Sequence, residues 1–230
     1  MFTFGPASRG GEVDPFAANV VLLCHFDGTN GDTTTTDVLG NAITLSGFDI
    51  SSAQSKFGGT SLRNSIASDS AGGAAITPAS GLQMGGSDFT FECWAWTTIT
   101  TNNHIFGFNV FSAGANDTIR VGTFGSTMTA VCGTDFTGIA TAFPTSQWNH
   151  VALTRAGNTA RLWLNGAQIG TRDVTGLVLP TQDRMTIGRE VRSGSTPLAW
   201  RGHIDEFRIT KGIARYTSSF TPPAAPFPNP

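Results

Sequence analysis

The 230-residue sequence has little charge and no long apolar run, and each scarcity excludes a class of partner. Charged residues make up 13% of the chain, and the net charge of −2 comes without a dense run of Lys or Arg. Nucleic-acid-binding proteins carry such a basic cluster, so we expect no nucleic-acid partner. No stretch of about 18 apolar residues is present, which predicts that the chain neither spans nor binds a membrane. The first residues also lack the basic start and apolar core of a secretory signal.

Cysteine is equally scarce. Cys24, Cys93 and Cys132 are too few and too scattered to form a disulfide framework. Each lies in an apolar run, which favours buried thiols that pack as small hydrophobic groups. A single disulfide, within or between subunits, is the alternative. No two cysteines have the spacing of a thiolate zinc site.

Glycine and aromatic residues are abundant, with 28 Gly, 17 Phe and 5 Trp. In "DFTFECWAWTT", Phe89 and Phe91 alternate with polar residues, which is typical of a strand with one buried face. The pair Asn165-Gly166 suits both left-handed positions of a type I′ turn and predicts a hairpin. About a dozen short strand patterns separated by turn signals predict an all-β fold of two antiparallel sheets.

The same reading divides the chain into three parts. Residues 1–19 contain isolated aromatics among Gly and Pro, which predicts an extended N-terminal arm. Strand patterns begin at Val20 and continue through residues 20–223 as a single domain. Residues 224–230 are rich in Pro, which is excluded from sheet interiors, so we expect a tail that lies extended on a surface.

Several segments, taken in order, resemble the laminin-G-like, concanavalin A-like jelly-roll domains. They are "LLCHFDGTNGD", "QSKFGGTSL", "DFTFECWAW", "WNHVALTR", "ARLWLNGAQIG", "MTIGR" and "GHIDEFRITKGIARYTSSFTPP". The likeness spans residues 20–223 and is greatest to the variant common in tail, fibre and other virion proteins of bacteriophages. It implies a two-sheet antiparallel jelly-roll sandwich in which the first and last strands lie side by side.

The resemblance also implies a metal site. Asp27 and Asp205 match the positions at which members of the family often bind one calcium ion, between the first and last strands. Asn30 and Asp32 follow Asp27 in a glycine-rich turn and could add oxygen ligands. A bound calcium ion would be structural, and no other cofactor is expected.

The residues by themselves leave a simpler interpretation of these acids. Asp27 and Asp205 could cap turns or pair with Arg201 or Arg208. Glu206, for its part, is expected to pair with an arginine such as Arg208 or Arg189, or to face solvent.

The neighbouring acids Asp205 and Glu206 do not form a catalytic pair in this interpretation. A glycosidase needs two carboxyl groups on one sugar, whereas adjacent residues of a regular strand face opposite ways. The Glu-x-Asp-x-x-Glu run of jelly-roll glycosidases is missing, and Glu92 stands alone in its strand. We therefore predict no enzyme activity, with glycoside hydrolysis as the less favoured alternative.

Tryptophan is the residue type most suited to bind sugars here. Trp94, Trp148 and Trp163 lie in strand patterns and are expected to pack in the domain. Trp200 follows the loop "SGSTPLA" and is the better candidate for an exposed sugar-binding ring.

The resemblance to virion proteins implies a non-enzymatic structural component of a phage, either a head decoration or part of a tail or fibre. Such a protein is made in the host cytoplasm and assembles into the virion. We expect a homo-oligomer that contacts capsid or tail proteins through residues 1–19 and has some capacity to adhere to cell-surface or environmental glycans. A carbohydrate-binding, lectin-like module is the alternative.

Overall fold

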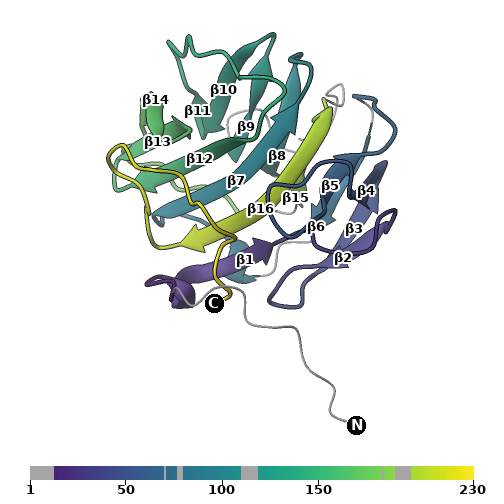
Figure 1. The fold of residues 1–230 in the computed structure, drawn as a ribbon. Coiled ribbons are helices and arrows are strands. Elements are labelled where there is room, and N and C mark those ends of the chain that lie inside the picture. Colours follow the sequence, from purple (N-terminus) through teal and green to yellow (C-terminus); the bar gives the residue numbers. More distant parts are fainter. Residues whose placement is uncertain (1–12, 70, 77–79, 110–118, 183, 190–197) are drawn as a thin grey trace.

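The computed structural model describes residues 13–69, 71–76, 80–109, 119–182, 184–189 and 198–230. The strands form two antiparallel sheets that pack face to face (Figure 1). The predicted two-sheet jelly-roll sandwich is therefore confirmed. Two short 3₁₀ helices, η1 (Ala17–Asn19) and η2 (Ser80–Leu82), complete the regular structure of the described residues.

The sheet nearer the viewer in Figure 1, which we call the front sheet, is built around the long strands β7 and β16. Its strands in spatial order are β14 (Ala167–Asp173), β13 (Thr159–Leu164), β12 (Asn149–Ala156), β7 (Phe89–Thr97), β16 (Gly202–Lys211), β5 (Ser61–Asn64) and β4 (Phe48–Ser51). β1 (Val20–Cys24) also pairs with β16. The first and last strands therefore lie side by side, as the family resemblance implied.

The other sheet, the back sheet, has eight strands in a single path. In spatial order they are β11 (Thr134–Asp135), β10 (Thr127–Cys132), β9 (Ile119–Phe124), β8 (Asn103–Asn109), β15 (Arg184–Ile187), β6 (Gly73–Ile76), β3 (Ala42–Ser46) and β2 (Thr34–Thr36).

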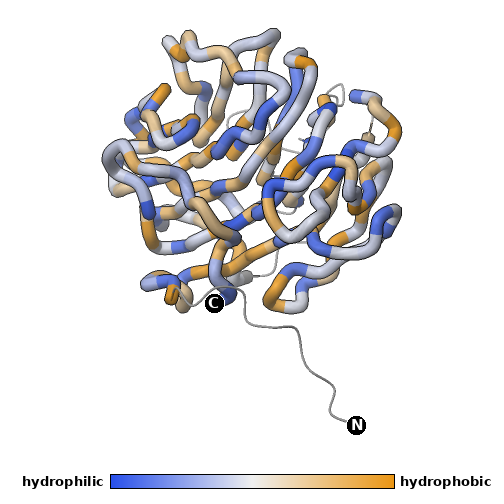
Figure 2. Tube along the Cα trace, viewed as in Figure 1, coloured by the Kyte–Doolittle hydropathy of each residue, from blue (hydrophilic) through white to orange (hydrophobic). Residues whose placement is uncertain are grey.

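Aromatic side chains from the inner faces of both sheets form the core. Phe91 of β7 stacks on Phe106 of β8 with ring centroids 5.5 Å apart, and Phe89 packs edge-on against Phe91. Hydrophobic and hydrophilic residues follow one another in short segments along the strands (Figure 2), as expected where one face is buried. No helix among the described residues is long and apolar enough to cross a membrane.

Two local predictions are confirmed. Asn165 and Gly166 both have positive φ, 50° and 80°, in the turn between β13 and β14. All three cysteines are buried and free, so they pack as hydrophobic groups.

Both ends of the domain pack on the outer face of the front sheet. After Lys211 the chain crosses this face without regular structure and ends near β1 (Figure 1). The proline-rich tail is anchored by Phe227, whose side chain is buried. Of the predicted arm, residues 1–12 lie outside the described residues, and Asp14 is buried against this same domain.

Candidate functional site

The paired acids Asp205 and Glu206 lie at a β-bulge in β16. The register with β7 shifts between Asp205 and Arg208, and Glu206 has a positive φ of 52°. A bulge inserts an extra residue and so breaks the alternation of faces. The assumption that the pleat separates Asp205 from Glu206 is therefore wrong, and the two acids are close enough for Glu206 to raise the pKa of Asp205.

Asp205 is completely buried and is surrounded by backbone N–H groups. Its Oδ2 accepts hydrogen bonds from the amides of Lys56 at 2.8 Å and Phe57 at 3.1 Å, and its Oδ1 accepts one from Glu206 at 2.9 Å. Burial raises the pKa of Asp205 to about 8, although the two loop amides lower it, and the charges of Glu206 and Asp27 add to the rise. The charge of Asp27 therefore acts in the neighbourhood of Asp205.

This neighbourhood does not fit calcium well. The ion needs six to eight oxygen ligands, whereas both oxygens of Asp205 already accept N–H donors. Asn30 accepts hydrogen bonds from Ser52 instead, and Asp32 accepts one from the amide of Thr29. In the described part of the chain, no group of three or more His, Cys, Asp or Glu could hold a metal. Calcium at Asp27 and Asp205 stays a prediction.

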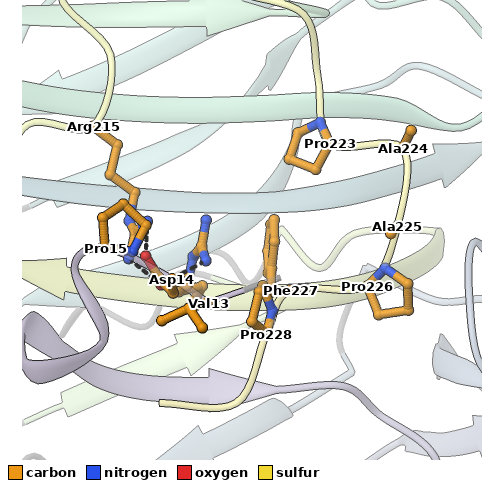
Figure 3. Close-up of a pocket in the computed structure, with 11 residues that line it drawn as sticks. Val13, Asp14, Pro15, Arg215, Pro223, Ala224, Ala225, Pro226, Phe227 and Pro228 are labelled. Atoms are coloured by element: carbon orange, nitrogen blue, oxygen red, sulfur yellow. Dashed lines mark hydrogen bonds and ion pairs between the residues drawn. The ribbon is translucent and has the colours of Figure 1, made fainter. Parts of the chain in front are cut away.

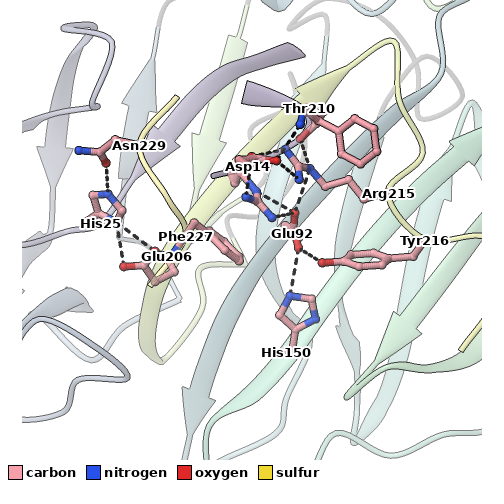
Figure 4. Close-up of polar contacts among 12 residues, drawn as sticks. Asp14, His25, Glu92, His150, Glu206, Thr210, Arg215, Tyr216, Phe227 and Asn229 are labelled. Carbon is pink, nitrogen blue, oxygen red and sulfur yellow. Dashed lines mark hydrogen bonds and ion pairs between the residues drawn. The ribbon is translucent and has the colours of Figure 1, made fainter. Parts of the chain in front are cut away.

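The isolated acid Glu92 of β7 is the centre of a buried polar network (Figure 4). Arg208 donates to its Oε1 through Nε at 2.9 Å and through a terminal nitrogen at 2.7 Å. Tyr216 donates to Oε2 at 2.7 Å, and Nε2 of His150 lies 3.2 Å from that oxygen. Burial alone would raise the pKa of Glu92, but the charge of Arg208 and the contacts with His150 and Arg215 hold it far below its usual range.

Glu206 has a different set of partners from those expected. Both its oxygens lie near Nδ1 of His25, at 2.8 and 3.0 Å, and Oε2 accepts the backbone N–H of Phe227 at 2.8 Å. The expected pairing with Arg208 or Arg189 is wrong, because Arg208 binds Glu92 and Arg189 donates to a backbone carbonyl. Glu206 thus fastens the tail to the end of β1.

A small cavity of about 240 Å³ lies where residues 13–15 meet the tail (Figure 3). Its charged side chains are already paired: Arg215 binds Asp14 at 2.7 and 2.9 Å, and Arg208 binds Asp14 at 3.2 Å. The guanidinium of Arg208 also stacks on the ring of Phe227, 3.9 Å from its centroid. The cavity therefore lies at the junction between the two ends of the domain, and the contacts that join these ends already occupy its charged groups.

Trp200 is not an exposed ring; among the aromatic residues in the described strands of the front sheet, Trp96 is the one that is half-buried and not fully buried. Trp200 is fully buried against Phe143, and its Nε1 donates to the carbonyl of Trp96 at 3.2 Å, so the expectation of an exposed ring was wrong. Trp94 and Trp163 are buried as expected, whereas Trp148 just before β12 and Trp96 at the end of β7 are half-buried.

Trp96 belongs to a row of residues that lie opposite one another across four strands. His203 pairs with Trp96 on one side and with Arg63 on the other, and Arg63 pairs with Asp49 on β4. We call Trp96, His203, Arg63 and Asp49 the outer-face row. Two hydrogen bonds join Arg63 to Asp49, and the rings of Trp96 and His203 meet edge to face at 5.5 Å. The outer-face row therefore combines an aromatic ring, an imidazole and an ion pair.

The imidazole of His203 can accept a hydrogen bond through Nε2. Ser61 donates its only hydroxyl proton to the carbonyl of Gln54 at 2.7 Å, so Nδ1 of His203, 2.9 Å from the same hydroxyl, must carry a proton. Burial, with help from the charge of Arg63, lowers the pKa of His203 to about 4. The ring is neutral at pH 7, and its Nε2 has a free lone pair.

Residues 69–214 match the family model described as the concanavalin A-like lectin/glucanases superfamily, of laminin G type. The chain belongs to this superfamily. The match covers β6 to β16 and therefore most of the front sheet. No curated protein matches the chain by sequence.

Solved structures with the same fold include three from larger proteins. Domain 4 of AbnA, a GH43 extracellular arabinanase from Geobacillus stearothermophilus in complex with arabinotriose, has a TM-score of 0.59 and 17% identity, over 85% of this chain and 94% of that one. The binding domain of Paraclostridial Mosquitocidal Protein 1 has a TM-score of 0.62 and 13% identity, and the match covers 87% of this chain and 50% of that one. Trypanosoma rangeli sialidase in complex with sialic acid has a TM-score of 0.59 and 16% identity, and the match covers 84% of this chain and 31% of that one. At these identities the likeness shows the fold alone.

Proposed function

We propose that this protein is a non-catalytic module that binds carbohydrate through the outer-face row. The observation that carries the proposal is the half-buried ring of Trp96 beside a neutral imidazole acceptor and the Arg63–Asp49 pair. Sugars present apolar faces that stack on aromatic rings and hydroxyls that need directed donors and acceptors. The row offers both on one surface.

The positions of the acids support a non-catalytic role. Glu92 is buried and bound by Arg208, His150 and Tyr216, and Asp205 is buried beneath the amides of Lys56 and Phe57. A glycosidase needs two carboxyl groups that reach the scissile bond. Neither acid could reach a substrate without the removal of its covering segment.

Two of the similar structures add support from their own ligands. The arabinanase domain was solved with arabinotriose and the sialidase with sialic acid. Both are carbohydrates, which makes a carbohydrate the first ligand class to test for this chain.

A glycan array followed by calorimetry tests the proposal. We expect Trp96→Ala to weaken binding at least tenfold, which corresponds to about 1.4 kcal/mol. Phe124→Ala is the control, because Phe124 is 73% exposed on the back sheet and should not change binding. No binding across the array, or equal binding by the Trp96 variant, would contradict the proposal.

A second candidate function is a structural part of a phage virion, in the head or the tail, with the glycan-binding surface used for adhesion. It is favoured by Val13, which is 84% exposed where the chain enters the domain beside the buried Asp14. Residues 1–12 would then contact capsid or tail proteins, and the protein would assemble as a homo-oligomer. If so, deletion of residues 1–12 should leave the melting temperature unchanged but abolish incorporation into virions, measured by mass spectrometry of purified particles. Normal incorporation of the deletion variant would exclude this role for the arm.

A further inference from the structure

The outer-face row carries no net charge at neutral pH. Arg63 and Asp49 are its charged members, and they form an ion pair in which Nε donates to Oδ1 at 2.9 Å and a terminal nitrogen donates to Oδ2 at 2.5 Å. Burial lowers the pKa of His203 to about 4, so the imidazole adds no charge at pH 7. The two charges of the row cancel, and a charged ligand of either sign gains little long-range attraction from it.

Every member of the row points away from the back sheet. Each stands next to a core residue in its own strand, and successive side chains of a strand point to opposite faces. These core neighbours are Ala95, Ile204, Leu62 and Ile50. The segment after β16 covers another part of the outer face, where Tyr216 binds Glu92. The side chain of Arg63 is 36% exposed, so a ligand on this face can reach the row.

The geometry of the ion pair disfavours an anionic ligand. Arginine binds carboxylates and sulfates best through two parallel N–H groups. In Arg63, Nε and one terminal nitrogen form this fork, and both already donate to Asp49. An acidic sugar would reach the remaining terminal nitrogen beside the carboxylate of Asp49, where repulsion offsets the attraction. Such a repulsive element is a common source of specificity.

His203 adds a second group that an anion cannot satisfy. Its Nε2 is a lone-pair acceptor, because Nδ1 carries the proton, and it has no hydrogen-bond partner among the described residues. A carboxylate also offers acceptors, whereas a sugar hydroxyl can donate to Nε2. The residue is 6% exposed, so an acceptor that loses water and gains no donor would weaken binding.

We propose that the outer-face row selects neutral glycans and discriminates against their acidic forms. Trp96 stacks on the apolar face of a sugar, and neighbouring hydroxyls donate to Nε2 of His203 and to Asp49 and accept from Arg63. A hydroxyl both donates and accepts, which suits a surface where acceptors and donors alternate. This selection rests on the carbohydrate binding proposed above and adds the class of ligand.

Lys56 is the cation that could oppose this selection. Its ammonium group lies over the ring of Trp94, 3.9 Å from the centroid. Trp94 and Trp96 are two residues apart in β7 and therefore share the outer face. An acidic sugar that extended from Trp96 toward Lys56 would gain an attraction that the row itself does not supply. The test therefore includes Lys56→Gln.

A glycan array with matched neutral and acidic ligands tests the selection. It presents lactose with sialyllactose, methyl-esterified with free oligogalacturonate, and other neutral glycans with their sulfated forms. The glycan that binds best and its matched partner are then compared by calorimetry at low salt. We expect the neutral member to bind about tenfold more tightly and added KCl to reduce the difference, because salt screens the repulsion from Asp49.

Asp49→Asn shows whether the ion pair is the source of the preference. The substitution frees the fork of Arg63 and leaves a positive charge on the row, so the acidic member should bind severalfold more tightly than it binds the wild type. The matched control is Asp135→Asn, which removes the same charge from an ion pair with Arg120 on the back sheet. The control should keep the preference of the wild type.

The outcomes separate this selection from carbohydrate binding itself. Equal or tighter binding of the acidic member, lost in Trp96→Ala, would overturn the selection and leave the carbohydrate proposal intact. If that binding were lost in Lys56→Gln, Lys56 would be the group that recognises an acidic glycan. A preference for the neutral member that is unchanged in Asp49→Asn would also overturn the selection by the ion pair. Binding to no glycan would overturn both proposals.

Discussion

Asp205 has a carboxyl group whose ionisation opposes folding. Its pKa is raised from an ordinary 3.8 to about 8 in the folded chain, so folding favours the protonated form. The stability that this preference contributes is complete below about pH 4 and is lost as the pH rises through 8. We expect the free energy of unfolding to fall between about pH 4 and 8 in urea titrations, and Asp205→Asn to remove much of that slope.

The same titration shows whether Asp205 binds calcium, because a bound ion would reverse the pH dependence of stability. A bound Ca²⁺ would favour the charged carboxylate, so calcium would lower the pKa of Asp205 and make stability rise with pH. The melting temperature would then also drop on addition of EDTA. Because backbone amides already occupy Asp205, we expect no effect of EDTA.

Glu92 has the opposite behaviour. Its pKa is held far below the usual value mainly by Arg208, so it stabilises the fold above about pH 4.5 and loses this effect only in strong acid. We expect Glu92→Gln to lower the free energy of unfolding by about 3–5 kcal/mol at pH 7, because it leaves buried arginines without their counter-ion. Asp49→Asn, at a partly exposed ion pair, should cost about 1 kcal/mol or less in the same urea titration. Equal losses in the two variants would show that Glu92 is not the centre of a buried network.

At the scale of the element, the tail acts as a third layer over part of the front sheet. Phe227 is buried against Arg208, and its amide is bound by Glu206. Phe227→Ala should lower the free energy of unfolding by about 3 kcal/mol, as expected for a large buried side chain. Pro222→Ala, which keeps the tail in place and removes a half-buried ring, is the control and should cost less than 1 kcal/mol in the same chemical denaturation. An equal loss in both variants would show that Phe227 does not anchor the tail.

Element by element, the sequence predicts local geometry better than long-range contacts. The alternation in β7 and the turn at Asn165-Gly166 follow from neighbouring residues, and both are correct. The bulge at Glu206 has no such signal, because "HIDEFRI" reads as a regular strand until its pairing with β7 and β1 is known.

The exposed ring was misassigned for a related reason. Trp200 follows a loop in the sequence, but tertiary packing buries it and leaves Trp96 half-exposed at a strand end. The outer-face row joins residues up to 154 positions apart, from Asp49 to His203, so no local pattern could reveal it. Tyr216, in the segment after β16, binds the buried Glu92 and is likewise more than a hundred residues away from it.

At the scale of the whole molecule, the two ends of the described chain are joined through the front sheet. Asp14 binds Arg215 through two hydrogen bonds across 201 positions of sequence, and both side chains are almost fully buried. Such a contact ties residues 13–19 and the tail into the same folding unit as the sandwich. Unfolding should therefore occur in one transition that fluorescence and circular dichroism report alike.

A double-mutant cycle tests this junction. We expect Asp14→Asn and Arg215→Gln each to destabilise the protein, and the double variant to lose less than the sum, with an interaction energy of about 1–3 kcal/mol. Asp49→Asn with Arg63→Gln is the matched cycle at a partly exposed pair and should give about 1 kcal/mol or less. Additive losses at Asp14 and Arg215 would mean that the ends pack independently. Residues 13–19 would then be free to leave the domain and bind a neighbouring subunit.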